Sequence, residues 1–395
     1  MAPAVTAATP ATPALIAATA LAVLATATAA RAQDEPAGPV LQWRASAGLE
    51  RDSNVLRAPQ ATADEAAVLA AGLHLDKRWS LQRLTLDAEA RRWHYRDFAN
   101  LDYRTLAYEA AWNFRVTPRL EGVLSAQRRQ YRDITDATPG AGSVFRRTER
   151  DELAQATWLG AGGWRALAGL SRRSSRSDDP RALESSPRVD SARLGGGYEF
   201  ASGARVLAWL RRGDGHYEDR VAPDFRETEP TVSLHWPATE GTTLDLRVGR
   251  LRRAHDAEPG RDFEGTVGSL EAGWRYSPKT RVDLGLARDL GSYEFAGGGH
   301  VRGWRAHVSP TWHATAKLTL RLRLAREKRA WQVAAAASPD AGRDDRLRQV
   351  SLGLDWDVMR ALRVSASVRR EWRDSSLPSH DFRARLVSLA ARLAF

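Results

Sequence analysis

Residues 387–395, with the sequence VSLAARLAF, alternate between two kinds of side chain. In an extended strand, Val387, Leu389, Leu393 and Phe395 share one face, and the opposite face carries Arg392. Slipping the register by one residue would put Arg392 on the apolar face, at a cost of about 2–4 kcal/mol if that face lay at mid-membrane. The alternation therefore fixes the register and predicts a strand with one apolar face and one polar face.

The same alternation recurs along most of the chain, in segments such as 41–49, 84–90, 106–112, 318–324 and 350–356. Most segments end in an aromatic residue, and Trp236, Trp274 and Trp312 are each separated by 38 residues. Nine tryptophans are predicted at this end of the strands, mostly on the apolar face: Trp43, Trp79, Trp112, Trp158, Trp164, Trp236, Trp274, Trp312 and Trp356. Aromatic rings at a lipid–water interface form such a girdle.

The connections between the segments alternate in length. Short turns rich in Pro, Gly, Ser and Thr are predicted near residues 77–80, 115–119, 159–163, 201–203, 237–241, 277–280, 313–317 and 357–361. Longer polar loops lie between them. This layout predicts an all-β fold, a transmembrane antiparallel up-and-down β-barrel of about 18 strands (16–20), with both termini on the short-turn side. Pro230 and Pro310 fall inside two predicted strands and make those two the weakest.

A β-propeller is the competing architecture, because its repeats of about 40–45 residues also carry a tryptophan. Each 38-residue step here holds two strands of about ten residues and one long loop, which is the size of a hairpin that crosses a bilayer. The barrel is therefore the preferred prediction.

The composition agrees with an exported barrel. Among 395 residues, 43% are hydrophobic, 27% are charged and none is cysteine, which excludes disulfides and thiolate sites. Residues 1–32 resemble a secretory signal that is cleaved before Gln33, and residues 33–395 would form the barrel. A disordered tail rich in alanine and threonine is the other interpretation of the first 32 residues. The net charge of +11 comes from arginines spread at strand spacing, which argues against a nucleic-acid partner.

No motif for an enzyme, a cofactor or a metal site is present, so the lumen is the candidate site and no cofactor is predicted. The inward positions are rich in both arginine and carboxylates, which predicts ion pairs that brace the wall and an excess of positive charge that favours anions. Aromatic rings beside arginines could contact a sugar polymer. The candidate contact residues are Arg83, Arg91, Trp93, Tyr95, Tyr103, Tyr131, Arg205, Trp209, Arg211, Arg321 and Arg323.

The run from Leu49 to Arg57 (LERDSNVLR) resembles the first-strand exit of the EpsL-type outer-membrane proteins of exosortase-associated exopolysaccharide operons. The runs 81–88, 95–103 and 147–150 and the segment ending at Trp158 resemble the same family. The resemblance is clearest over residues 40–175. It implies a β-barrel that helps a polysaccharide to cross the outer membrane, and it carries no catalytic residues.

The predicted function is therefore an outer-membrane component of exopolysaccharide export, with outer-membrane lipid, exopolysaccharide and periplasmic export components as partners. A general, weakly anion-selective porin is the alternative, and an outer-membrane hydrolase built from Asp and His residues across strands is a third hypothesis. Any gate is predicted in the longest loops, residues 133–148 and 327–345.

Overall fold

The computed structural model describes residues 40–133, 145–178, 187–217, 224–292, 299–333 and 340–395. These residues form one sheet of eighteen strands. The strands are β1 (Leu41–Asp52), β2 (Asp64–Trp79), β3 (Gln82–Tyr95), β4 (Tyr103–Thr117), β5 (Leu120–Asp133), β6 (Phe145–Leu159), β7 (Trp164–Ser177), β8 (Pro187–Glu199), β9 (Arg205–Tyr217), β10 (Phe225–Thr239), β11 (Thr242–His255), β12 (Phe263–Ser277), β13 (Thr280–Ser292), β14 (Gly299–His313), β15 (Leu318–Val333), β16 (Asp344–Met359), β17 (Leu362–Ser375) and β18 (Phe382–Ala394).

Helix is limited, in the described residues, to four single 3₁₀ turns: η2 (Ala99–Leu101), η3 (Ala161–Gly163), η4 (Pro259–Arg261) and η5 (Pro378–His380). None of these helices is long and apolar enough to cross a membrane.

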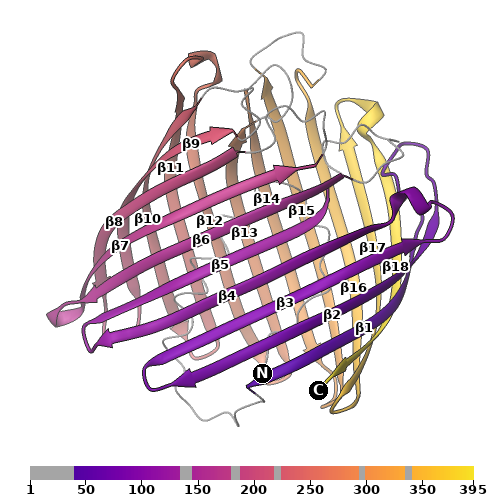
Figure 1. The fold of residues 1–395 in the computed structure, drawn as a ribbon, viewed down its shortest axis with the longest axis horizontal. Coiled ribbons are helices and arrows are strands. Elements are labelled where there is room, and N and C mark those ends of the chain that lie inside the picture. Colours follow the sequence, from indigo (N-terminus) through magenta and orange to yellow (C-terminus); the bar gives the residue numbers. More distant parts are fainter. Residues whose placement is uncertain (1–39, 134–144, 179–186, 218–223, 293–298, 334–339) are drawn as a thin grey trace.

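Each strand pairs antiparallel with its neighbours in sequence, and β1 pairs with β18 to close the sheet. Two backbone hydrogen bonds between Trp43 and Phe395, of 2.8 and 3.0 Å, complete the seam. Figure 1 shows the tilted strands of the resulting barrel, with both described chain ends at the edge where the short turns lie. The predicted up-and-down barrel of eighteen strands is confirmed, and one continuous sheet excludes the propeller.

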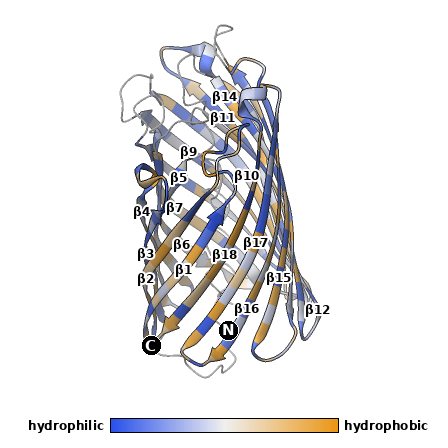
Figure 2. Ribbon diagram, turned by 90° about the vertical axis from the view of Figure 1, so that its right-hand side faces the viewer, coloured by the Kyte–Doolittle hydropathy of each residue, from blue (hydrophilic) through white to orange (hydrophobic). Residues whose placement is uncertain are grey.

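The register places the apolar face outside. Leu49 lies opposite Leu389 and Glu50 lies opposite Ser388 across the closing seam, so side chains of one kind meet on each face. Leu389 is exposed on the outer surface, as are the other large apolar residues of this face. Figure 2 shows the alternation as orange and blue stripes along the strands. A water-soluble protein would bury such a face, so this surface requires lipid.

The aromatic girdle is also confirmed. All nine tryptophans predicted at the short-turn end point outward, and between 40% and 63% of each is exposed. Trp304 lies on the outer face at the opposite end and is 50% exposed. The two interfacial levels are thus marked by rings on the outside of the barrel.

The two proline-containing segments are full strands, because each proline interrupts only one of its two ladders. In β10, Pro230 stays in register with Leu210 of β9, whereas the pairing with β11 skips from Thr228 to Thr231. In β14, Pro310 stays in register with Val282, whereas the pairing with β15 skips from Val308 to Thr311. Proline lacks an N–H donor, so one missing rung per proline is the expected cost.

The predicted short turns are confirmed, but several strands run further toward the long loops than the sequence indicated. β15 continues to Val333 and β16 begins at Asp344, which shortens the connection predicted at residues 327–345. Charged residues carry the alternation in these extensions, which is why they resembled loop. The predicted signal segment (residues 1–32) and the central parts of both predicted gating loops (134–144 and 334–339) lie outside the described residues.

Candidate functional site: the arginine-lined lumen wall

The inner wall of the barrel is a network of arginines and carboxylates from neighbouring strands. Arg83 of β3 donates hydrogen bonds of 3.0 and 2.7 Å to the two carboxylate oxygens of Asp76 of β2. On β3, Arg91 donates to Glu89 at 2.5 Å. Across the barrel, Arg321 of β15 pairs with Asp355 of β16. The predicted bracing of the wall by ion pairs is therefore present at these positions.

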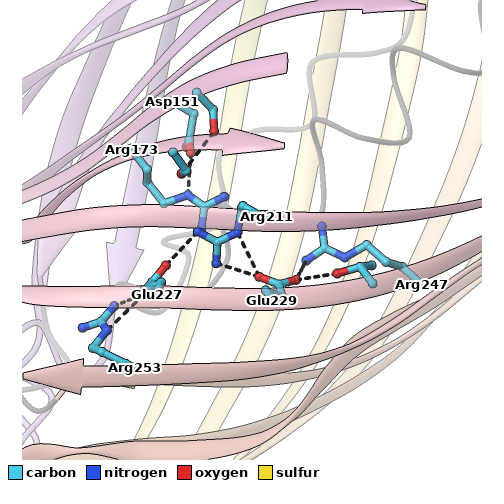
Figure 3. Close-up of polar contacts among 10 residues, drawn as sticks. Asp151, Arg173, Arg211, Glu227, Glu229, Arg247 and Arg253 are labelled. Atoms are coloured by element: carbon cyan, nitrogen blue, oxygen red, sulfur yellow. Dashed lines mark hydrogen bonds and ion pairs between the residues drawn. The ribbon is translucent and has the colours of Figure 1, made fainter. Parts of the chain in front are cut away.

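The densest part of this network centres on Arg211 of β9 (Figure 3). Its guanidinium donates to Glu227 and Glu229 of β10, each at 2.7 Å. Glu227 also accepts from Arg253 of β11 at 2.6 Å. Glu229 accepts from Thr231 at 3.1 Å. Only 5% of Glu227 and 7% of Glu229 is exposed, so these charges are held by their partners rather than by water.

Beside this network, β6 to β11 enclose a small recess of about 70 Å³ that is lined by Arg173, Arg193, Trp209, Arg211 and Arg247. Arg173 pairs with Asp151 at 2.9 Å. Arg247 lies 3.6 Å from Glu229. Arg193 forms no ion pair with any described residue. Its Nη2 donates to Gln155, and its buried Nε has no hydrogen-bond partner among the described atoms. The recess therefore carries more positive charge than its carboxylates neutralise.

Trp209 fits into this recess because the facing residue is a glycine. Gly195 of β8 lies directly opposite Trp209. A Cβ atom at position 195 would lie 2.5 Å from the Cβ atom of Trp209, which is closer than side chains approach. Gly195 thus leaves room for a large ring on the inward-facing wall.

The predicted aromatic residues of β3 and β4 gather at the long-loop mouth. Trp93 stacks on Tyr103 with ring centroids 4.4 Å apart, and the Arg91 guanidinium lies 5.5 Å from the Trp93 centroid. Tyr95 is 8% exposed and packs with Val55 and Leu101 under the loop that follows β1. In this arrangement the rings mainly contact one another, and the loop packs on them.

The remaining predicted residues lie apart from these two groups. Tyr131 donates to Glu149 at 2.8 Å near the mouth. Arg205 faces inward on β9 with no ion pair to a described residue, opposite Glu199. Arg323 of β15 donates to Ser309 at 3.1 Å. The candidate residues therefore form a mouth cluster, a recess and scattered wall positions rather than one site.

The sequence did not single out Glu227 and Glu229, which hold Arg211 in place. They lie on the strand that Pro230 made uncertain. Extending the alternation of Thr231, Ser233 and His235 backward through the proline would have placed both glutamates on the inner face.

The net charge of the inner face differs from that of the outer face. This difference corrects the prediction of an excess of positive charge in the lumen. Inward-facing arginines and carboxylates of the described strands are nearly equal in number. The outward face has few acids and many exposed basic residues that form no ion pair with a described residue. These are Arg92, Arg104, Arg150, Arg176, Arg212, Arg252, Arg288, Arg302, Arg326, Lys328, Arg346, Arg370, Arg383 and Arg385. Most of the excess charge in the described strands therefore lies outside, and the lumen is positive only locally.

The described residues contain no group of three or more His, Cys, Asp or Glu side chains that could hold a metal ion.

Part of the sequence matches a known protein family, and the fold resembles solved barrel structures. Residues 232–395 match a protein family described as "Putative beta-barrel porin 2". Two solved structures from Pseudomonas aeruginosa share the fold, each with a TM-score of 0.50 over 90% of this chain. OccK1 (OpdK) is 12% identical over 99% of its own length, and OccK2 (OpdF) is 15% identical over 97%. The protein is a porin-like β-barrel of the bacterial outer membrane. No curated protein matches the sequence.

Proposed function

We propose that this porin-like barrel conducts small anionic solutes through a water-filled lumen. Eighteen strands enclose an interior wide enough for an aqueous path. The observation that carries the proposal is the recess, where Arg193 stands without a carboxylate partner among the described residues, beside Trp209 and Arg211. An anion that enters the lumen gains at this point a guanidinium that the wall itself does not neutralise.

On the rest of the inner wall, arginines and carboxylates are nearly equal in number. This balance supports weak rather than tight binding of anions. Conduction requires sites that attract a solute and still release it. Arg211 is fixed between two glutamates and offers little free charge, whereas Arg193 makes one neutral contact, to Gln155. The proposal contains no catalytic step, because the lumen ion pairs account for the inward carboxylates discussed above without a nucleophile or a general base.

Reversal potentials across planar bilayers in a potassium chloride gradient test this function. The wild-type channel is expected to pass chloride in preference to potassium. Replacing Arg193 with glutamine should move the permeability ratio toward one, because the least compensated guanidinium of the recess is lost. Arg252→Gln removes the same charge from the outer face of β11 and should leave the ratio unchanged. A preference for potassium in the wild type, or equal effects of both variants, would contradict the proposal.

Exopolysaccharide export is a second candidate function. The resemblance of residues 40–175 to EpsL-type proteins favours it, and so does the placement of the Trp209 ring among arginines, where an acidic sugar could stack and form ion pairs. An acidic polysaccharide added to one side of the bilayer should then block the ion current. Trp209→Ala should weaken the block while ion selectivity is retained. Free ion flow in the presence of polymer would contradict export and leave the anion channel standing.

A further inference from the structure

A dense patch of positive charge covers the outer face of four consecutive strands at their long-loop ends. It consists of Arg326 and Lys328 of β15, Arg346 of β16, Arg370 of β17 and Arg383 and Arg385 of β18, and it is called the outer basic patch below. All six side chains are exposed, and none forms an ion pair with a described residue. The outer face of these strands carries only two acids, Asp344 and Asp374, and Asp374 pairs with Arg348.

The register of the strands brings like charges directly together. Arg326 lies opposite Arg348, and Lys328 lies opposite Arg346 across the β15–β16 ladder. Arg370 lies opposite Arg385 across the β17–β18 ladder. Side chains opposite each other in antiparallel strands have Cβ atoms about 4.5–5.5 Å apart, and like charges at that distance destabilise the sheet. The inner wall also has opposed arginines, such as Arg193 and Arg211, but carboxylates such as Glu227 and Glu229 lie beside them. The outer basic patch has almost no carboxylates.

The patch begins where the lipid-facing surface ends. On β16, the outward positions are Trp356, Leu354, Leu352 and Val350, and Arg348 and Arg346 follow. On β18, Leu389 and Val387 precede Arg385 and Arg383 in the same way. Alternate residues of a strand are about 6.6 Å apart, so each first arginine lies within one such step of hydrocarbon-facing side chains. This is the level of lipid headgroups, on the side of the membrane that the long loops face.

A groove in the outer surface joins the apolar band to the patch. Val308, Leu324 and Val350 line its apolar part. Its charged part is lined by Trp372, by Arg326 and Arg383, and by the ion pair of Arg348 with Asp374, so arginines outnumber the single carboxylate. Trp372 lies directly between Arg348 and Arg383 in the sheet. A molecule that fills this groove needs hydrocarbon at one end and anionic groups at the other.

We propose that the outer basic patch binds a phosphorylated glycolipid of the outer leaflet, with its acyl chains on the apolar band and its phosphate groups between the opposed arginines. Guanidinium groups form strong bidentate contacts with phosphate, and a phosphate between two facing arginines removes their repulsion. The lipid therefore supplies the negative charge that the strands lack. This inference concerns the outside of the barrel and holds whichever solute passes through the lumen.

The test compares two triple variants of the full chain, purified in a neutral detergent and titrated with lipopolysaccharide. Arg326→Gln, Arg370→Gln and Arg385→Gln together remove three charges from the patch. Arg193→Gln, Arg205→Gln and Arg323→Gln together remove three lumen charges that have no ion-pair partner among the described residues, so the change in net charge is matched. The patch variant should bind lipopolysaccharide at least about tenfold more weakly than wild type. The lumen variant should bind like wild type.

Two further experiments are needed. The first separates the loss of charge from misfolding, and the second separates lipid binding from binding of free phosphate. The patch variant with lysine at all three positions keeps the charge and should retain most of the affinity, and resistance of each variant to unfolding by detergent confirms the barrel. Dephosphorylated lipopolysaccharide should bind wild type as weakly as the patch variant binds the intact lipid. Equal affinity of wild type and the glutamine patch variant, equal loss in the lumen variant, or full competition by millimolar inorganic phosphate would each overturn the proposal.

Discussion

Arg211 on the inner wall and Arg370 on the outer face belong to the same sheet, yet their surroundings differ in kind. Arg211 lies between Glu227 and Glu229 and is largely withdrawn from water. Arg370 is exposed and has no ion-pair partner among the described residues. A buried guanidinium such as that of Arg211 needs its counter-charge from the protein, whereas an exposed one at the level of the lipid headgroups can find it in the membrane. The burial of an arginine thus bears on which kind of partner it uses.

The largest expected effect comes from removing the central arginine of the inner network. Arg211→Met leaves two buried glutamates with fewer partners, and breaking a buried pair costs about 3 kcal/mol or more. The midpoint of urea unfolding in lipid vesicles should fall accordingly. The paired but exposed outer arginine Arg348 is the matched control, because exposed pairs contribute less than about 1 kcal/mol. Equal losses from Arg211→Met and Arg348→Met would remove the distinction between the two faces.

The second prediction tests the two faces with a single new charge. Leu352 of β16 points into the lipid band, and the adjacent Ser351 points into the lumen. Leu352→Arg should destabilise the barrel by about 2–4 kcal/mol, because a charge then lies near the middle of the membrane. Ser351→Glu places a charge in the lumen, opposite Arg323 and Arg369, and should not destabilise the barrel. Unfolding of both variants in vesicles measures the difference in stability. Similar stabilities would mean that the lipid-facing and lumen-facing sides of β16 have been assigned wrongly.

The sequence predicted the fold well because the period of two is a local property. The alternation of Leu352 with Ser351, or of Leu389 with Ser388, gives the face of every side chain without any knowledge of the partner strand. The tryptophans at the short-turn end then fix the direction of each strand. Proline obscured β10 and β14, since the sequence does not show which of the two ladders loses its rung.

The candidate site was harder to predict because it depends on which strands are neighbours and on the register between them. Trp209 and Arg211 were chosen individually, but the recess also needs Gly195 opposite the ring and Arg193 near Gln155, which only the register supplies. Tyr95 was placed on the inner face, yet its packing against Val55 depends on how the loop after β1 folds back. The excess charge of the outer face is visible only when both faces of every strand are counted separately.

The smallest expected effect concerns pH at the rim, where the buried arginines Arg343 and Arg373 act on a histidine of the η5 turn. Burial, reinforced by the positive charges of Arg343 and Arg373, lowers the pKa of His380 below its usual value of 6.5, although Asp340 and Asp345 oppose the shift. The unfolded segment therefore binds a proton more readily than the folded one, so the stability of the turn is highest above pH 6.5 and falls as the pH drops from 6.5 through the lowered pKa.

Hydrogen exchange of residues 376–381 should accordingly be faster at pH 5 than at pH 7.5, once the intrinsic pH dependence of exchange is corrected. The His380→Asn variant should lose this difference, since asparagine does not titrate. The Arg373 Nε donates to the backbone carbonyl of His380 at 2.5 Å, and the substitution keeps this contact. Faster exchange at the higher pH, or the same pH response in the asparagine variant, would show that the titration of His380 does not set the stability of this turn. The backbone amides of the outer basic patch lie outside this turn. They should exchange with the same corrected rate at both pH values.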